Sequence, residues 1–426
     1  MKKSKIIALT LATLMLLTLL AGCGEGGGGG GGDKVTVEWW SLWDAEIDEV
    51  MIADFEAEFS DIEIIRTQHG DPGIWEAMVV AIATGVGPDL NFNWSGAFNE
   101  MFYRNGGNIS MNPYAEEYGW FDMLVPGAME IVTYDGNLSL IPYQMNAMGL
   151  VYKKSTFEQY GLSEPNNYAE LANICDTLAA NGVVPFSIGG KTNWHAMRWL
   201  DAIVDVFAGP EMHDRLKNMD DTSVTWESPE AIAAFQEITE WLDRGWIDPN
   251  FLGVDEGETY MPIYTGDAGM NIQGDWVEGN IRDAGFDSND FGYFPFPGKN
   301  GMGRLSAFVS GIALTNFNSD EATDAGAQFL NFIIQDEQVA KYIPMFGCLS
   351  GVKSAPVDPS ANILNIVLDY LGRCGTILPG DQAFPNETIE VFLNLSQELL
   401  SAQTTPEDAG RRVEESLASA RANAEN

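Results

Sequence analysis

Short β-branched and aromatic segments alternate with segments of helical periodicity along most of this chain, and this alternation restricts its fold more than any other feature. Residues 35–40 read VTVEWW, and apolar residues then recur at helical spacing through residues 47–59. The same order of strand and helix patterns follows at residues 62–65, 75–83 and 89–92. Strands that alternate with helices form βαβ units, so the sequence predicts an α/β fold with a mostly parallel sheet.

The alternation returns in the second half of the chain. Residues 150–152 and 269–273 have strand patterns, and residues 168–180 have a helical one. Residues 228–230 and 405–408 each begin with a Ser or Thr cap followed by proline, which is typical of a helix start. Because 426 residues are too many for one simple core, we expect two domains or lobes.

The composition is that of a folded and strongly acidic protein. Hydrophobic residues make up 45% of the chain, and the net charge is −40. Such a field repels phosphate backbones, so the sequence predicts no nucleic-acid partner. Solubility or a saline habitat explains the acidity better than a ligand does.

The N-terminus carries an export signal. Three lysines precede an apolar run at residues 6–20, which is too short for a comfortable membrane span and is typical of a signal peptide. The run ends in Leu-Ala-Gly-Cys at residues 20–23, which resembles the bacterial lipoprotein processing box. The resemblance implies a signal peptide over residues 1–22 and a lipid on Cys23, with residues 23–33 as a glycine tether. An ordinary signal peptide with a chance cysteine is the alternative.

Three further cysteines lie in the body of the chain. Cys175 stands in a helical pattern and is expected to be a buried thiol. Cys348 and Cys374 flank a loop-rich stretch of an exported protein, so a disulfide between them is possible.

The motifs of several enzyme classes are missing from the sequence. There is no Gly-x-Ser-x-Gly elbow, no His-Glu-x-x-His and no phosphate-binding glycine loop. The three histidines are scattered, so we expect no metal site, and we expect no cofactor. Sixty-two acidic residues make chance carboxylate pairs certain, so glycoside hydrolysis stays open.

A series of motifs in one order resembles a known family. The motifs are the aromatic first strand at residues 35–43, the ATGVGPDL turn at 83–90, the segment at 134–143, the GLVYKK strand at 149–154 and the glycine-to-tryptophan segment at 266–276. They are similar to those of the extracellular solute-binding proteins of ATP-driven importers, the group that includes maltose- and oligosaccharide-binding proteins.

The resemblance implies a two-lobed clamp of the type II periplasmic-binding-protein class, in which each lobe is a mostly parallel sheet flanked by helices. The N-terminal lobe would comprise residues 34–145 and 310–347, and the C-terminal lobe residues 146–309 and 348–426. The chain would cross between them near residues 145–149, 308–311 and 346–351. A sugar would bind in the cleft, and the lobes would close on it.

The family resemblance also implies partners and a location. The partners would be a small-molecule carbohydrate and the transmembrane subunits of an ABC permease, and the protein would act as a monomer. It would be lipid-anchored to the outer face of the cell membrane, or periplasmic.

Aromatic and polar residues follow several predicted strands, where open α/β sheets bind ligands. Sugars present apolar C–H faces and rims of hydroxyls, so a sugar site needs aromatic planes and planar polar groups. The candidate ligand-binding residues are Trp43, Asp44, Asn93, Trp94, Tyr143, Gln144, Asn146, Trp194, Asp275 and Trp276.

Each candidate also has a structural alternative. Asp44 fits a helix cap, and the amide of Asn146 could satisfy backbone groups at a hinge. Trp43 is favoured over Trp40 as the exposed tryptophan of the first strand, because strand residues alternate faces. Trp276 follows a strand end and the family's residue at that position stacks on sugar, so it is expected to form a platform.

Three functions remain open at this point. The first is a binding protein for a sugar or oligosaccharide. The second is the same clamp with a cationic ligand such as a polyamine, for which aromatic boxes and carboxylates are also suited. The least favoured is a secreted glycan-cleaving enzyme.

Overall fold

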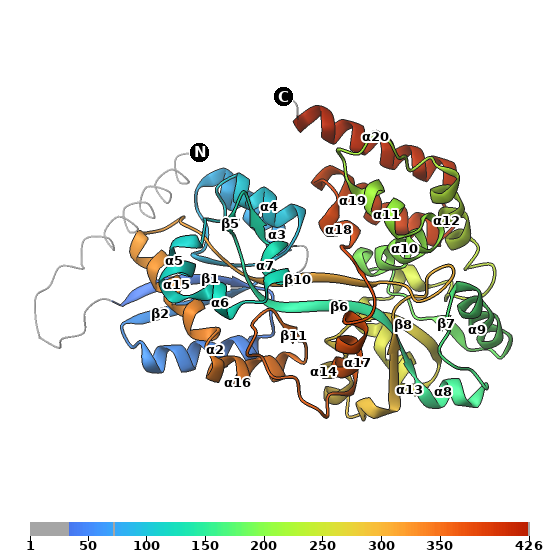
Figure 1. The fold of residues 1–426 in the computed structure, drawn as a ribbon, viewed down its shortest axis with the longest axis horizontal. Coiled ribbons are helices and arrows are strands. Elements are labelled where there is room, and N and C mark those ends of the chain that lie inside the picture. The colour runs from blue at the N-terminus through green and yellow to red at the C-terminus, as the bar shows by residue number, and fades with distance from the viewer. Residues whose placement is uncertain (1–33, 71–72, 425–426) are drawn as a thin grey trace, which may run out of the picture.

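The computed structural model describes residues 34–70 and 73–424, without the side chain of residue 424. The predicted signal peptide, the lipidated Cys23 and the glycine tether lie outside these residues. Figure 1 shows two α/β lobes side by side, joined by two long strands, β6 (Ile141–Lys153) and β10 (Leu305–Leu314). This architecture is the α/β class that the sequence predicts.

A parallel sheet forms the centre of the N-terminal lobe. The strand β1 (Val35–Ser41) pairs in parallel with β2 (Ile62–Gln68) and with β3 (Leu90–Trp94). The helices α2 (Ala45–Glu58) and α3 (Gly73–Thr84) connect these strands. Trp39 is fully buried, and its ring centroid lies 5.3 Å from that of Phe329 in α15 (Asp320–Ile333), so helices from the late part of the chain complete this lobe. Its other elements are α4 (Ala97–Arg104), α5 (Asn112–Tyr118), α6 (Trp120–Met123), α7 (Pro126–Glu130), β4 (Thr133–Tyr134), β5 (Asn137–Leu138), α15 (Asp320–Ile333) and α16 (Asp336–Phe346).

The strands β6 and β10 belong to both lobes. Residues 310–314 of β10 pair with β3, and residues 306–312 pair with β6, both antiparallel. The second half of β6 then pairs with β8 (Ala268–Gly274) and β9 (Phe291–Phe294) of the C-terminal lobe. A third connection, β11 (Leu349–Ser350), pairs with β6 at Met145 and Gln144. The sheet is therefore continuous from one lobe to the other.

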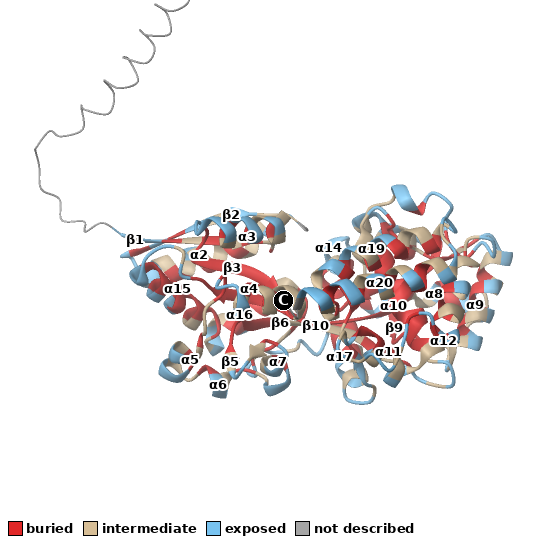
Figure 2. Ribbon diagram, turned by 90° about the horizontal axis from the view of Figure 1, so that it is seen from above, coloured by how far each residue is buried: buried red, intermediate tan, exposed pale blue. Residues whose placement is uncertain are grey.

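The C-terminal lobe is built around a buried helix, α10 (Asn193–Ala208), which is buried from His195 to Val206. The sheet of this lobe adds β7 (Val184–Phe186), parallel to β8. Figure 2 shows the buried segments inside each lobe and exposed helices around them. The other elements are α8 (Lys154–Gln159), α9 (Tyr168–Ala180), α11 (Pro210–Lys217), α12 (Pro229–Thr239), η1 (Phe251–Gly253), η2 (Glu256–Thr259), α13 (Tyr260–Thr265), α14 (Val277–Asp283), η3 (Ser288–Asp290), α17 (Asn362–Leu371), β12 (Thr376–Ile377), α18 (Gly380–Ala383), α19 (Asn386–Leu400) and α20 (Pro406–Ala424).

Each lobe has its own hydrophobic core. The core of the N-terminal lobe draws on residues 37–143 and 309–352, and the main core of the C-terminal lobe on residues 148–308 and 384–417. Separate apolar cores are expected of domains that can move relative to each other. The two cores are discontinuous in sequence, and the exact lobe boundaries stay predictions.

The structure contradicts the disulfide that the sequence suggests between Cys348 and Cys374. Cys348 and Cys374 are free thiols in this structure. Cys348 lies in the wall between the lobes close to Gln144, whereas Cys374 follows α17 and packs into the C-terminal lobe beside it. The two cysteines therefore belong to different surroundings, which their sequence separation alone could not reveal. Cys175 is buried, as expected.

Within the described ranges, no helix combines the length and the apolar character needed to cross a membrane.

Candidate functional site

A cavity of about 810 Å³ lies between the lobes and is lined by residues of both. This volume falls in the range of pockets that bind small molecules, roughly 300–1,000 Å³. Its lining is rich in aromatic side chains: Trp43, Trp75, Phe92 and Trp94 from the N-terminal lobe, Trp194, Trp276 and Phe308 from the C-terminal part, and Phe346 from the last crossing. We call it the aromatic cleft.

Trp276 borders the cleft at the end of β8. A Cβ atom on Gly274 would lie 2.1 Å from Cζ3 of Trp276, so the indole can rest against the strand only because residue 274 has no side chain. The ring of Phe308 lies 6.2 Å away at an angle of 60°. Trp276 is thus half-buried: it lines the cleft, and it also packs against the core of the C-terminal lobe.

Hydrogen bonds behind Trp276 hold its indole. The Nε1 of Trp276 donates to the hydroxyl of Tyr260 at 3.1 Å, and that hydroxyl donates to Oε1 of Glu256 at 2.5 Å. The Nε2 of Gln273 also donates to Glu256, at 2.9 Å. Burial raises the pKa of the Glu256 carboxyl. Because the indole N–H is already bonded within the protein, Trp276 offers the cleft its aromatic face and not a donor.

The opposite wall comes from the N-terminal lobe. Trp75 packs edge-to-face on Trp94, with 5.1 Å between their centroids, and Phe92 lies 4.8 Å from Trp94. The sequence predicts a helix at Trp75 and gives no sign that its side chain lines a site. It reaches the cleft because α3 begins at the same end of the sheet at which β3 stops.

Trp43 also lines the cleft, but its side chain is more buried than the sequence predicts. Only 7% of its surface is exposed, because it packs against Phe92, Tyr143 and Phe346. Trp40, which the sequence predicts to be the more buried of the two, is half-buried, and its ring centroid lies 4.8 Å from that of His69 at a tilt of 48°. The Nε1 of Trp43 donates to Oε1 of Gln144 at 3.1 Å, so this tryptophan fixes a polar group at the cleft floor.

Amides of the crossing strands form that polar floor. Gln144 and Asn146 both line the cleft from β6, with Ser310 of β10 between them. The Ser310 hydroxyl lies 3.0 Å from Oε1 of Gln144 and 3.2 Å from Oδ1 of Asn146. Amide and hydroxyl groups can both donate to and accept from sugar hydroxyls.

Trp194 stands at the first turn of α10, and a buried ion pair lies next to it. The guanidinium of Arg198 is 5.8 Å from the Trp194 ring and binds both carboxylate oxygens of Asp381, at 2.8 and 3.0 Å. Asp381 belongs to the short helix α18. The sequence does not predict this pair, because its members are 183 residues apart and no local pattern joins them.

Four predicted site residues do not line the aromatic cleft, and the structure shows why for each. Asp44 caps α2 by accepting from the amide of Glu46 at 2.8 Å, and it borders a different opening between the lobes. Asn93 is buried and accepts from the amide of Trp94 at 2.9 Å. Tyr143 is buried with its hydroxyl 3.4 Å from the carbonyl of Ile333.

Asp275, the fourth, is fully buried beneath the crossings. It accepts from the amide of Ala147 at 3.2 Å and from the amide of Leu349 at 2.7 Å. Burial raises the pKa of its carboxyl to about 7, although these amides oppose the shift. Asp275 therefore ties β6 and β11 together and is not available to a ligand. These four residues leave the candidate set.

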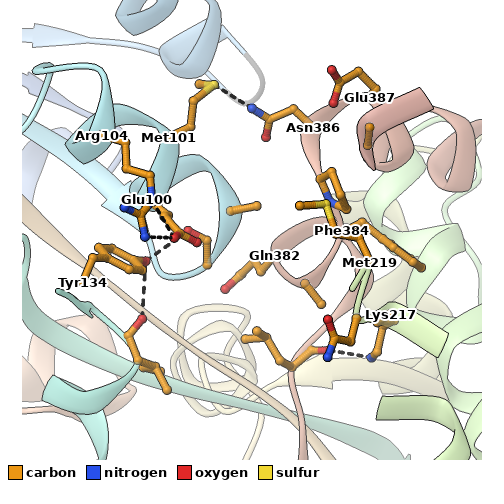
Figure 3. A pocket seen from close by; sticks show the side chains of 18 of the residues that line it. Glu100, Met101, Arg104, Tyr134, Lys217, Met219, Gln382, Phe384, Asn386 and Glu387 are labelled. Carbon is orange, nitrogen blue, oxygen red and sulfur yellow. Dashed lines mark hydrogen bonds and ion pairs between the residues drawn. The ribbon is translucent and has the colours of Figure 1, made fainter. Parts of the chain in front are cut away.

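A larger cavity of about 1200 Å³ also separates the lobes (Figure 3). Most charged side chains of its wall have partners, among them Arg104, which bonds Glu100, and Lys217, which donates to the carbonyl of Leu378. Its aromatic lining residues are Tyr134 and Phe384, and Phe384 is fully buried. The smaller cleft, with tryptophans on both walls, therefore offers a ligand more aromatic surface than the larger cavity does.

A contact between the lobes divides the two cavities. The hydroxyl of Ser95 donates to Oε1 of Gln382 at 2.8 Å, and Gln382 lines both spaces. A Cβ atom on Gly96 would lie 2.2 Å from the carbonyl oxygen of Gln382, so the backbones approach closely here. The segment that carries Asp381 and Gln382 thus closes one end of the aromatic cleft.

A two-lobed α/β clamp with an aromatic cavity at its hinge defines the class of ligand-binding receptors. A family model described as bacterial extracellular solute-binding protein matches residues 50–363. The chain belongs to this family.

Several relatives and solved structures with similar chains are named as sugar-binding proteins. A probable sugar-binding periplasmic protein of Mesorhizobium japonicum is 28% identical over 191 residues, which cover 44% of each chain. The maltotriose-binding protein of Pyrococcus abyssi is 25% identical and covers 67% of this chain and 58% of its own. A solved chitin oligosaccharide binding protein has a TM-score of 0.84 at 20% identity and covers 92% of this chain and 100% of its own, a likeness of fold. The chain spans between 44% and 63% of the length of several curated relatives.

Proposed function

We propose that this protein is the substrate-binding component of an ABC importer, which captures a sugar or oligosaccharide in the aromatic cleft and delivers it to a membrane permease. The observation that carries the proposal is the cleft itself, where Trp94 of one lobe and Trp194 and Trp276 of the other surround an amide-lined floor. Aromatic faces suit the C–H surface of a pyranose, and the amides suit its hydroxyls. The names of the relatives support the same ligand class.

The two alternative functions, a polyamine-binding clamp and a glycan-cleaving enzyme, have less support than sugar binding. A polyamine ligand has no support among the relatives, because the names of several of them specify a sugar. The family is one of binding proteins, and we infer that this chain does not cleave its ligand. Prolonged incubation of the purified protein with an oligosaccharide, followed by product analysis, tests this point; shortened products would contradict it.

Anchoring at the cell surface is part of the proposal, and it depends on residues outside the described part of the chain. The box at residues 20–23 supports lipid attachment to Cys23, and the glycine tract supports a tether to the folded body. Cys23→Ser is expected to release the protein into the medium or leave it unprocessed. A variant that still carries lipid and fractionates with membranes would contradict the anchor.

A thermal-shift screen over a panel of neutral sugars tests the ligand class. A ligand that binds only the folded state raises the melting temperature, by mass action. Each hit would be titrated by calorimetry at low and high salt. Sugar affinity should be nearly independent of ionic strength, whereas a polyamine should lose affinity as salt screens its charges. A response to polyamines and to none of the sugars would overturn the proposal.

A further inference from the structure

The charged side chains of the aromatic cleft carry an excess of negative charge. Two cations and four carboxylates line it: Lys191, Arg198, Glu76, Asp255, Asp381 and Glu390. Each cation is matched to one carboxylate, with Lys191 3.0 Å from Asp255 and Arg198 2.8 Å from Asp381. Within the described part of the chain, Glu76 and Glu390 have no ion-pair partner. The cleft therefore has no cation left to receive an anion.

Arg198 is the residue that would otherwise bind a carboxylate. Its guanidinium is 4% exposed and lies between the rings of Trp194 and Phe308, at 5.8 and 5.7 Å. Bidentate pairing with Asp381 uses one N–H of each terminal nitrogen. Its Nε points at the sulfur of Met148, at 3.2 Å, which is a weak acceptor. Its positive charge is thus cancelled by Asp381 alone.

Asp381 cannot readily move aside for a ligand. It lies in α18, whose first amide, that of Gly380, donates to Oδ2 of the buried Asp201 at 2.6 Å. Two residues earlier, the carbonyl of Leu378 accepts from Lys217 at 2.6 Å. The carboxylate of Asp381 is consequently fixed against Arg198 by the charged network behind it.

We propose that the cleft binds neutral sugars and rejects sugars that carry a carboxylate, such as uronic acids, and that Asp381 sets this preference by neutralising Arg198. The inference rests on the proposed function and names the class of sugar. A ligand carboxylate would meet Glu76 and Glu390 without a free counter-charge. Both carboxylates are exposed, so their repulsion is felt at low salt and is screened as salt rises. Discrimination by repulsion is a common source of specificity.

The first test compares matched ligands on the wild-type protein. Maltotriose, cellotriose and chitotriose, each beside a form oxidised to the acid at its primary hydroxyls, would be titrated by calorimetry. We expect each neutral sugar that binds to have an affinity at least about tenfold higher than that of its acid. This difference in affinity should become smaller at high salt. Equal affinities, or binding of an acid alone, would overturn the inference. Binding of none of these sugars and none of the acids would instead overturn the proposed function, and this inference with it.

The second test changes Asp381. Asp381→Asn leaves the charge of Arg198 free, so the preference for the neutral form should shrink by about tenfold. Asp255→Asn is the matched control, because its partner Lys191 is 62% exposed and screened by solvent, and it should leave the preference within about threefold. If Asp381→Asn does not fold, Glu390→Gln should still reduce the preference at low salt. If the folded Asp381→Asn protein discriminates as the wild type does, that result would contradict the role proposed here. If Asp381→Asn does not fold, the same result for Glu390→Gln would contradict it.

Discussion

Single residues decide whether the cleft presents aromatic faces, and Trp276 is the clearest case. Trp276→Ala should weaken sugar binding by about tenfold to several hundredfold, because stacking and burial of one aromatic face are lost. The free energy of unfolding without ligand should change much less than for a core tryptophan. Trp226, which is fully buried and stacked on Phe235, is the control, and Trp226→Ala should cost about 3–5 kcal/mol.

Measuring affinity and unfolding on the same two variants separates a platform from a core residue. Large destabilisation by Trp276→Ala, with affinity intact in the folded fraction, would show that Trp276 is structural.

Gly274 matters because it leaves room for that indole. In Gly274→Ala, the new Cβ would fall 2.1 Å from the ring, so the ring must leave its position or the strand must shift. We expect at least about tenfold weaker sugar binding by calorimetry. Gly253→Ala is the matched control, since nothing lies within 4 Å of a Cβ there, and it should bind as the wild type does. Unchanged affinity in Gly274→Ala would mean that the indole position is unimportant.

The sequence predicts the aromatic members of the cleft better than its polar members. Trp94, Trp194 and Trp276 lie at strand ends or at a helix start, and a large ring there is hard to bury completely. Asp44 and Asp275 had equally suitable positions, yet a helix start and a hinge each used their carboxylates. Which backbone amides need an acceptor depends on packing between distant segments, and this is invisible in the sequence.

At the scale of elements, Asp275 couples the crossing strands and should make stability depend on pH. Its pKa is about 7 in the folded protein and about 3.9 in an unfolded chain. Between these values the folded state binds the proton more strongly, so its contribution to stability falls as pH rises from about 4 to 7. Asn cannot titrate. The stability of the wild type minus that of Asp275→Asn should therefore decrease over this range, by about 1–3 kcal/mol.

Denaturant unfolding at pH 4.5 and 7.5, values chosen at about the two ends of that window, measures the change. Burial also raises the pKa of Asp48, to about 6, but Asp48 is present in both proteins and cancels in the difference. Parallel pH profiles would show that Asp275 is not protonated in the folded state.

Elements with strong local signals were predicted within a few residues. The strand β1, the helix α9 and the capped helices α12 and α20 lie where periodicity and caps put them. Of the 13-residue β6, the strand pattern marks only residues 150–152, and the family resemblance adds residues 149–154 and a crossing near 145–149. A strand buried on both faces lacks alternation, so the rest of β6 gave no signal. The four-residue α18 gave no signal, although it carries Asp381 and Gln382.

At the scale of the whole molecule, the two lobes share β6, β10 and β11 and otherwise have separate cores. A clamp of this kind should close on its ligand. Small-angle X-ray scattering should therefore give a smaller radius of gyration with a saturating sugar than without it. The Trp276→Ala variant at the same sugar concentration is the control, because weaker binding should leave more of it open. An unchanged radius for the saturated wild type would indicate a rigid cleft.

The proposed function requires that a sugar bind between the lobes against tryptophans of both. The most direct test is a crystal structure of the complex with the sugar that gives the largest thermal shift. We predict a sugar ring within about 4 Å of the Trp276 indole face, with hydroxyls bonded to Gln144 or Asn146. A sugar bound instead in the larger cavity beside Tyr134, or outside both cavities, would contradict this account.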